Sequence, residues 1–312
     1  MEKELKLFAG RANKPLAEKI ARHLELPLAD VEITNFADGE IRINIKENVR
    51  GKDVFVIQPT PPPAENILEL LLLIDALKRS SSRRITAVIP YYGYARQDRK
   101  DKPRVPLSAK LIANLLTRAG IDRVLTMDLH ADQIQGYFDI PVDHLFSTPV
   151  LVQYFSRSRE NMVVVAPDTG RANRARGFAE RLAPKIPIAI IDKRRTAPNQ
   201  SEALRVIGDV SGLDALIFDD MIDTGGTILQ ATEAVLAAGA RSVRATATHG
   251  IFSRDAINLL GDSQISEVVI TDTINLPREK MHPKIKILSV SALLAEAILR
   301  IHREESVSSL FI

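Results

Sequence analysis

An apolar run that ends in two adjacent aspartates is the segment of this sequence best suited to chemistry. Residues 217–227 read Ile-Phe-Asp-Asp-Met-Ile-Asp-Thr-Gly-Gly-Thr, and a helical pattern follows from about residue 228. A strand here would bring Asp219 and Asp220 to its carboxyl end, and the loop would lead into a helix N-terminus. The backbone N–H groups of residues 224–227 can then bind an anion, which the helix dipole also favours.

The acidic pair restricts the kind of anion that this loop could bind. Carboxylates repel a phosphate unless they accept hydrogen bonds from hydroxyl groups of the same ligand, so the pairing indicates a phosphorylated sugar. The alternative is a capped helix after a buried strand, with glycine in a turn. Two consecutive aspartates at the end of an apolar strand would be costly in that case, so we favour a binding loop.

The elements that position this loop follow from the hydrophobic pattern. Short apolar runs alternate with longer amphipathic stretches, which predicts an α/β fold around a mostly parallel sheet. We expect strands at 6–8, 41–45, 54–57, 85–89, 124–127, 162–166, 188–191, 215–218, 242–248, 268–270 and 285–289. We expect helices at 15–24, 65–78 and 107–119, the last of these ending at Gly120 as its C-cap. In the second half we expect helices between the strands and a final helix at 291–304. Polar residues alternate with isoleucines in 41–45, so that strand should be half exposed.

The length of 312 residues suggests two domains. We place them at 1–146 and 147–302, followed by a C-terminal tail at 303–312. The segments Gly10-Arg-Ala-Asn-Lys and Gly170-Arg-Ala-Asn-Arg each follow a predicted strand and precede a predicted helix. This similarity indicates two related α/β units, although five residues are too few to prove a duplication.

Composition excludes several classes of protein. The net charge is +3, which is too small by itself to argue for a nucleic-acid partner, and we expect none. The chain has no cysteine, which removes disulfides and thiol chemistry and fits a cytoplasmic location. The most apolar segment, 67–77, contains two acidic residues and is shorter than the roughly 20 residues of a membrane span, so no membrane partner is expected.

Six segments, taken in order, resemble one enzyme family. Together with 217–227 they are 35–40, 89–99, 128–131, 166–170 and 191–195. Their order and spacing resemble those of the ribose-phosphate pyrophosphokinases, which synthesise 5-phosphoribosyl-1-pyrophosphate (PRPP), and the resemblance covers essentially the whole chain. It implies two related phosphoribosyltransferase-like domains, each a mostly parallel sheet flanked by helices. It also implies transfer of the diphosphoryl group of Mg-ATP to the 1-hydroxyl of ribose 5-phosphate, giving PRPP and AMP.

The resemblance also implies a role for individual residues. It assigns ATP binding to Asp38, Gly39, Glu40, Arg96, Gln97 and Arg99. It assigns ribose 5-phosphate to Arg195, Asp219, Asp220, Asp223, Thr224, Gly225, Gly226 and Thr227. Catalysis falls to Lys193 and Arg195, and Mg²⁺ to His130 and Asp168. Both substrates are polyanions, so such a site needs positive charge, and its catalysis should rest on positioning and charge neutralisation.

Each of these residues could instead have an ordinary structural role. The basic run at 96–104 and the tribasic run at 193–195 resemble solvated surface. Asp38 and Gly39 could form only a turn, a lone histidine such as His130 is usually structural, and Asp168 could cap a helix. The family resemblance favours function at each position.

One residue departs from the family pattern. Family members often have a second glycine after Pro-Asp-x-Gly, whereas this chain has Arg171. The departure leaves the local backbone shape open.

A regulatory site is implied by a serine- and arginine-rich segment. Residues 79–84, together with the tail, resemble the phosphate or ADP site of the phosphate-activated class, which implicates Ser81, Arg84, Ser306 and Ser308. Inorganic phosphate and ADP are therefore expected regulators, and the resemblance implies a homo-oligomer, commonly a hexamer. Serine-rich turns and termini are also ordinary features of surfaces.

Two other functions remain in competition. A phosphoribosyltransferase that consumes PRPP shares residues 219–227 but leaves Arg96, His130 and Lys193 unexplained. A non-catalytic regulatory subunit of the same fold could lose its catalytic side chains, yet none of the expected ones is missing from this sequence.

Overall fold

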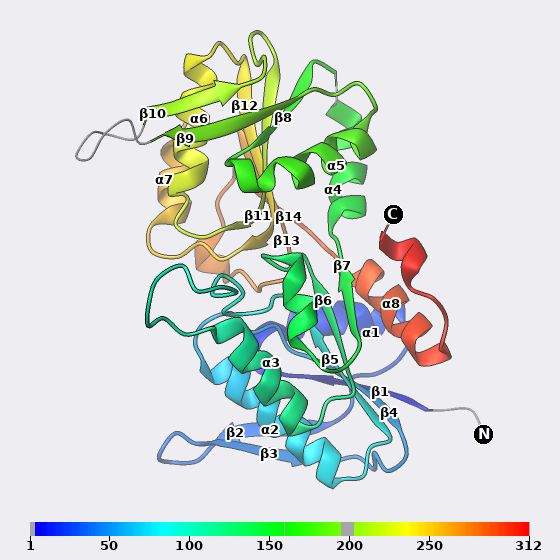
Figure 1. Cartoon of the computed structure of the whole chain (residues 1–312). Coiled ribbons are helices and arrows are strands. Elements are labelled where there is room, and N and C mark those ends of the chain that lie inside the picture. Colours follow the sequence, from blue (N-terminus) through cyan, green and yellow to red (C-terminus); the bar gives the residue numbers. More distant parts are fainter. Residues whose placement is uncertain (1–3, 159, 195–202, 312) are drawn as a thin grey trace. The chain divides into compact units, whose positions relative to one another are not determined.

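The structure is a computed structural model that describes residues 4–158, 160–194 and 203–311, with 193, 194, 203 and 311 described by their backbone alone (Figure 1). The described chain divides into two compact units. Unit 1 comprises Met1–Phe146, Thr273–Asn275 and Ser289–Ile312, and unit 2 comprises Ser147–Asp272 and Leu276–Leu288. The predicted α/β fold class is confirmed.

Unit 1 is built on a parallel sheet. Within its described residues the sheet has five strands in the order β1-β4-β5-β6-β7, and neighbouring strands are parallel. They are β1 (Leu5–Ala9), β4 (Asp53–Ile57), β5 (Arg84–Ile89), β6 (Arg123–Met127) and β7 (Val142–Leu145). The helices are α1 (Lys14–His23), α2 (Glu65–Arg79), α3 (Ser108–Ala119) and α8 (Ser291–Arg303). Helix α1 packs against α8, and α2 packs against α3 (Figure 1).

A separate hairpin belongs to unit 1. Strands β2 (Val31–Asn35) and β3 (Ile41–Ile45) pair antiparallel in a sheet of their own, with Asn35 opposite Ile41. Strand β3 contacts α2, and its isoleucines are partly buried. The prediction of a half-exposed strand is confirmed, because one face of the hairpin packs on the core and the other meets solvent.

Unit 2 contains a larger sheet. Its described strands run in the order β10-β9-β8-β11-β12-β13-β14, antiparallel at β10–β9 and parallel at the other pairs. They are β8 (Met162–Ala166), β9 (Ile188–Arg194), β10 (Ala203–Ile207), β11 (Asp214–Ile222), β12 (Ser242–Gly250), β13 (Glu267–Thr271) and β14 (Ile285–Leu288). The helices are α4 (Thr148–Phe155), α5 (Ala172–Leu182), α6 (Gly226–Ala237) and α7 (Ala256–Asp262).

Strand β8 is a continuous apolar run because its side chains alternate between two hydrophobic cores. Val163 and Val165 join a core with α6 and α7, while Met162, Val164 and Ala166 join a second core with α4 and α5. Helices therefore cover both faces of the sheet, and every residue of the strand is buried.

The short elements and helix ends complete the described fold. Short 3-10 helices occur at η1 (Arg11–Asn13), η2 (Asp132–Tyr137), η3 (Ser156–Ser158), η4 (Thr169–Arg171), η5 (Arg278–Lys280) and η6 (Ser308–Phe311). Gly120 follows α3 with φ +116°, which confirms the predicted C-cap. In the part of the chain that the structure describes, no helix is both long and apolar enough to span a membrane.

The compact units differ from the predicted division at the C-terminal helix. Residues 289–302, placed with the second domain from sequence, belong to unit 1. Helix α8 packs on α1, Arg84 Nη2 donates to the Ile301 carbonyl at 3.0 Å, and His302 Nδ1 lies 2.7 Å from Asp53 Oδ2. These contacts are between residues more than 200 positions apart, so the local pattern does not reveal them.

The buried Asp53 carboxylate should be a main stabiliser of unit 1. Its side chain is 2% exposed and accepts two hydrogen bonds from Arg84, at 2.8 and 2.5 Å. Asp53→Ala should lower the free energy of unfolding by about 3 kcal/mol in urea titrations, because breaking a buried pair leaves a charge without its partner. As a control, Asp75→Ala removes the exposed pair with Arg79 and should cost only about 0.5 kcal/mol. Equal losses would refute this account.

Candidate active site

The predicted anion-binding loop lies between β11 and α6 in unit 2. Strand β11 continues to Ile222, so Asp219 and Asp220 lie in the C-terminal part of the strand and not beyond its end. Gly225 precedes the helix with φ +80°, a left-handed conformation that glycine adopts without strain. The first N–H groups of α6 have no acceptor within the helix, as an anion site at this loop would require.

Asp220 is buried, Asp219 is partly buried, and both pair with one cation. The side chains of Asp219 and Asp220 are 13% and 1% exposed. Arg171 lies beside both, with Nε 3.3 Å from Asp219 Oδ1 and Nη2 2.8 Å from Asp220 Oδ1. Burial and the charge of Asp220 raise the pKa of the Asp219 carboxyl well above its usual range, and Arg171 opposes that increase. The guanidinium therefore favours the ionised form of the pair.

The departure at Arg171 leaves the local backbone turn intact. Asp168 is the N-cap residue of η4, and its Oδ1 accepts a hydrogen bond from Arg171 N at 3.1 Å. Helix α5 starts directly afterwards at Ala172. Asp168 thus caps a helix, as the ordinary alternative predicts. A carboxylate has two oxygens and several lone pairs, so capping leaves capacity for another ligand.

In unit 1, the proposed ATP residues Asp38, Gly39 and Glu40 form the turn between β2 and β3. All three are exposed. Phe36 N donates to Glu40 O at 2.8 Å, and Glu40 N donates to Asp38 Oδ1 at 3.0 Å. Gly39 has φ +98°, which explains glycine at this position. The turn is well formed, and its carboxylates face solvent.

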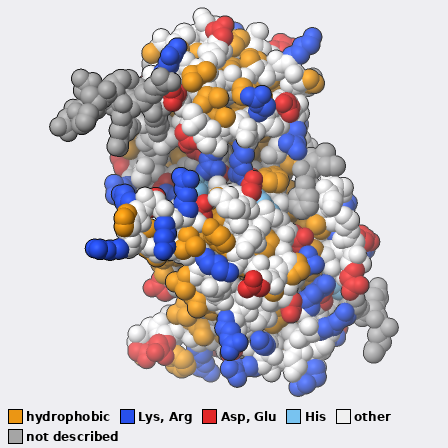
Figure 2. Space-filling model, in the orientation of Figure 1, with side chains coloured by type: hydrophobic (Ala, Val, Ile, Leu, Met, Phe, Trp, Pro, Cys, Tyr) orange, Lys and Arg blue, Asp and Glu red, His pale blue; other side chains and the backbone are white. Residues whose placement is uncertain are grey.

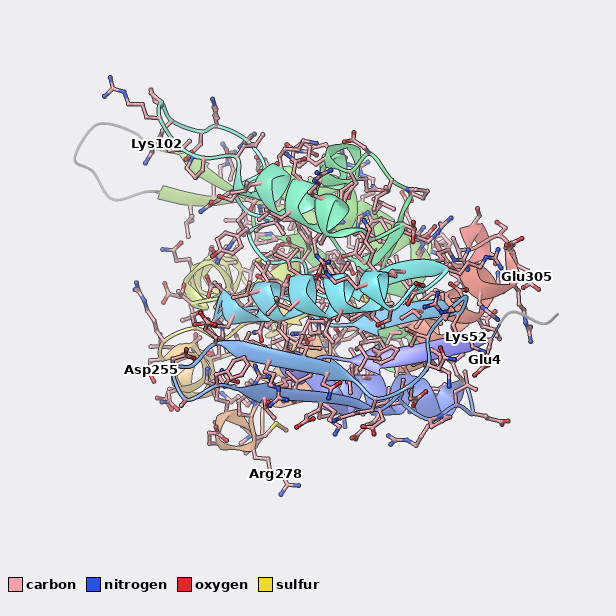
Figure 3. All side chains as sticks on the ribbon, turned by 90° about the horizontal axis from the view of Figure 1, so that it is seen from below. Glu4, Lys52, Lys102, Asp255, Arg278 and Glu305 are labelled. Carbon is pink, nitrogen blue, oxygen red and sulfur yellow. The ribbon has the colours of Figure 1, made fainter. Side chains whose placement is uncertain are left out.

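The second group of proposed ATP residues follows β5. Arg96, Gln97 and Arg99 are exposed, whereas Asp98 between them is buried. Gln97 O accepts from Ala109 N at 3.2 Å, which fixes the loop to the start of α3. Basic side chains gather over this loop in Figure 2, and Figure 3 shows Lys102 pointing outward from it. The loop offers cations to an anionic ligand.

Asp98 links this loop to the segment that carries His130. Gln133 Nε2, in η2, donates to Asp98 Oδ2 at 2.9 Å, and the Tyr137 hydroxyl donates to the Asp98 carbonyl. His130 is half-buried and lies between β6 and η2. Strands β5 and β6 are parallel neighbours, so their carboxyl ends bring the two segments to one edge of the sheet.

Lys193, one of the two proposed catalytic residues, lies near the end of β9. Strand β9 extends three residues beyond the predicted strand, and Lys193 pairs by its backbone with Leu204 of β10. Arg195 lies outside the described residues. The role of both side chains therefore remains a prediction from the family resemblance.

The proposed regulatory residues all belong to unit 1. Ser81 follows α2 with φ +62°, and Arg84 is engaged with Asp53 as described above. In the tail, Ser306 Oγ donates to Ser308 Oγ at 3.1 Å. Contacts between Arg83 and Glu304, at 3.9 Å, and between Arg84 and Ile301 bring the two segments together.

Sequence reasoning missed the partners that hold the site residues. The sequence marks Arg171 only as a departure from the family pattern, and nothing in it singles out Asp98 between Gln97 and Arg99. A charged residue that lies among candidate binding residues, as Asp98 does, indicates a side chain that fixes the loop. If such a group is buried, it requires hydrogen-bond partners from neighbouring elements.

The parallel sheets with helices, and a helix N-terminus beside a buried acidic pair, define a protein of the phosphoribosyltransferase-like α/β class. Residues 5–120 match the model for the N-terminal domain of ribose phosphate pyrophosphokinase, and residues 194–312 match the phosphoribosyl synthetase-associated domain. The chain belongs to the ribose-phosphate pyrophosphokinase family.

Relatives of known name match along nearly the whole chain. The ribose-phosphate pyrophosphokinase of Caldanaerobacter subterraneus subsp. tengcongensis is 57% identical over 98% of each chain. That of Thermotoga maritima is 54% identical over 99% of this chain and 98% of its own. The crystal structure of phosphoribosylpyrophosphate synthetase from Mycobacterium smegmatis matches with a TM-score of 0.92 and 43% identity, covering 97% of this chain and 100% of that one.

Proposed function

We propose that this protein transfers the diphosphoryl group of Mg-ATP to the 1-hydroxyl of ribose 5-phosphate. The hydroxyl oxygen attacks the β-phosphorus and gives up its proton to solvent. The bond between that phosphorus and the α,β-bridging oxygen breaks, and the products are PRPP and AMP. The observation that carries the proposal is the acidic pair of β11 beside the N-terminus of α6. Because the chain belongs to this family, we take ribose 5-phosphate to be the phosphorylated sugar that this loop binds.

Each part of the unit 2 loop has a task in this reaction. The first N–H groups of α6, with Thr224 and Thr227, hold the 5-phosphate. The carboxylates of Asp219 and Asp220 accept hydrogen bonds from the ribose hydroxyls, and the neighbouring Arg171 guanidinium favours their ionised form. The sugar is then anchored at both ends, which fixes the direction of its 1-hydroxyl.

The loops of unit 1 have the chemistry to bind ATP. Arg96 and Arg99 are exposed cations suited to phosphate oxygens, and Arg96 could also stack on adenine. Gln97 adds directional hydrogen bonds, while Asp38 and Glu40 can accept from the adenine amino group or the ribose. Lys193 and Arg195 are assigned to stabilising the charge of the migrating group.

The donor set fits Mg²⁺ bound together with ATP. In the described ranges, no group of three or more His, Cys, Asp or Glu side chains is arranged to hold a metal ion. Mg²⁺ does not need one, because it commonly binds through one or two carboxylates plus phosphate oxygens and water. The family resemblance assigns the ion to Asp168 and His130, and a bound Mg²⁺ would neutralise phosphate charge.

The metal assignment predicts a specific effect of Asp168→Asn. The amide oxygen can still cap η4, so the fold should persist while the negative charge is lost. The Mg²⁺ concentration for half-maximal rate should rise by about tenfold, since even the partners of metal ligands are worth that much. Asp209→Asn is the matched control, because Asp209 Oδ1 similarly accepts from Ser211 N at 2.9 Å. An unchanged Mg²⁺ titration would remove Asp168 from the metal site.

A direct assay separates the proposed function from its competitors. Purified protein with Mg-ATP and ribose 5-phosphate should form PRPP and AMP in equal amounts. A phosphoribosyltransferase would instead require PRPP and a nucleobase, releasing pyrophosphate without AMP. A regulatory subunit would form no AMP under either condition, and that outcome would overturn the proposal.

Regulation and assembly are further parts of the proposal. The family resemblance supports a cytoplasmic homo-oligomer, commonly a hexamer, with inorganic phosphate and ADP as regulators. Light scattering after size-exclusion chromatography measures the assembly. Rate measurements with varied phosphate and ADP test the regulators.

A further inference from the structure

Arg11, in the recurring Gly-Arg-Ala-Asn segment, has no task in the function proposed above. It opens η1 after β1, and its side chain is 44% exposed. Its partner is Glu69 of α2, whose side chain is only 2% exposed. Arg11 Nε donates to Glu69 Oε2 at 2.5 Å, and Arg11 N donates to Glu69 Oε1 at 2.6 Å. The carboxylate therefore fixes both the backbone and the side chain of Arg11.

A buried glutamine completes this anchor. Gln58 is fully buried, and its Nε2 donates to Glu69 Oε1 at 3.1 Å while its Oε1 accepts from Ala12 N at 3.1 Å. A Cβ at Gly10 would come within 2.2 Å of Gln58 Oε1, so glycine is needed for this close approach. The anchor is thus built into the core of unit 1.

The guanidinium reaches from this anchor to the hairpin. Arg11 Nη1 donates to Asn35 Oδ1 at 2.7 Å, and Asn35 Nδ2 donates to the Gly39 carbonyl at 2.7 Å. Asn35 is the last residue of β2, and Gly39 lies at the centre of the exposed turn. Figure 3 shows the hairpin strands beside α2, the helix that carries Glu69. A continuous chain of hydrogen bonds therefore joins a buried carboxylate to the turn.

We propose that Arg11 is a positioning residue that holds the turn of residues 36–40 in its binding conformation. The proposal rests on the proposed function, because Asp38 and Glu40 are its ATP contacts. A two-stranded hairpin has little burial of its own to order its turn, and ordering it on binding would cost affinity. The same motif in unit 2 supports the inference, since Arg171 also pairs with buried carboxylates.

Two substitutions break this series of hydrogen bonds at different points. Both leave a positive charge at position 11 to pair with Glu69. Arg11→Lys keeps a cation but loses the fork that reaches two partners. Asn35→Ala leaves the Arg11–Glu69 pair intact and breaks the link to Gly39. Each should raise the KM for ATP by about tenfold, with the KM for ribose 5-phosphate and kcat within twofold of the parent. The double variant should match the single variants, because both act through one link.

The matched control is Arg241→Lys. Arg241 also holds a carboxylate through two nitrogens, Asp214 in unit 2, and is exposed. Its KM values should not change. If Arg11→Lys raised the KM for ATP and the KM for ribose 5-phosphate equally, Arg11 would have a purely structural role and the proposal would be overturned. Additive effects of the two substitutions in the double variant would overturn it as well.

Hydrogen–deuterium exchange tests the link without any turnover. Peptides covering residues 36–40 should exchange several-fold faster in Arg11→Lys and Asn35→Ala, while peptides from β4 and α2 stay unchanged. Unchanged exchange in the turn would overturn the proposal. A parent protein that forms no AMP would instead refute the proposed function, so the two failures are distinguishable.

Discussion

Lys193→Ala should lower kcat by about 10² to 10³, because loss of one preorganised charge costs on the order of 3 to 4 kcal/mol of transition-state stabilisation. If the ammonium meets the migrating phosphoryl oxygens mainly in the transition state, kcat and kcat/KM should fall together with KM nearly unchanged. Steady-state kinetics with both substrates varied measures these quantities, and circular dichroism confirms folding.

The control for this prediction is Lys185→Ala. Lys185 is exposed and precedes β9, the strand in which Lys193 lies. A solvated lysine of this kind should change kcat by less than twofold. A kcat of Lys193→Ala within about threefold of the parent would refute the catalytic role.

The fold was predictable where strands are buried on both faces. Strands β4 and β8 are apolar runs whose boundaries follow from composition, because helices cover the sheet on each side. Strands β2, β7 and β10 were not predicted. They lie at the edge of a sheet or outside the main one, and their residues mix apolar with polar or charged types. Such short runs resemble loops until their partner strands are known.

The sequence predicts where the candidate site residues lie, but not which side chains they contact. The loop at 219–227 could be read as a strand, turn and helix start, since that order is local. The pairing of Arg171 with Asp219 and of Arg11 with Glu69 joins residues about 50 positions apart in the sequence. Side chains from separate elements meet only through the packing of the sheet and its helices, so spacing alone does not reveal them.

Asp220→Asn should weaken ribose 5-phosphate binding by about 10- to 100-fold, because a hydrogen bond to a charged acceptor contributes roughly 1.5 to 3 kcal/mol. The amide has nearly the same shape as the carboxyl, so packing at this buried position should persist. The affinity for ATP should stay within twofold of the parent. Calorimetry with each substrate measures both affinities.

Asp214→Asn is the matched control, since Asp214 begins the same strand and pairs with Arg241. Both of its affinities should resemble those of the parent. Equal losses for the two substrates in Asp220→Asn would contradict a role confined to the sugar.

The pH dependence of the same variant tests the electrostatic account of the acidic pair. Burial and the neighbouring charge of Asp220 raise the pKa of Asp219 in the parent. Ribose 5-phosphate affinity should therefore fall as the pH decreases through that raised pKa, since a protonated carboxyl accepts hydrogen bonds less well. In Asp220→Asn the like charge is gone, so the pKa of Asp219 should fall and the acid limb should move to lower pH. An acid limb that stays in place would mean that the two carboxylates do not act as a coupled pair.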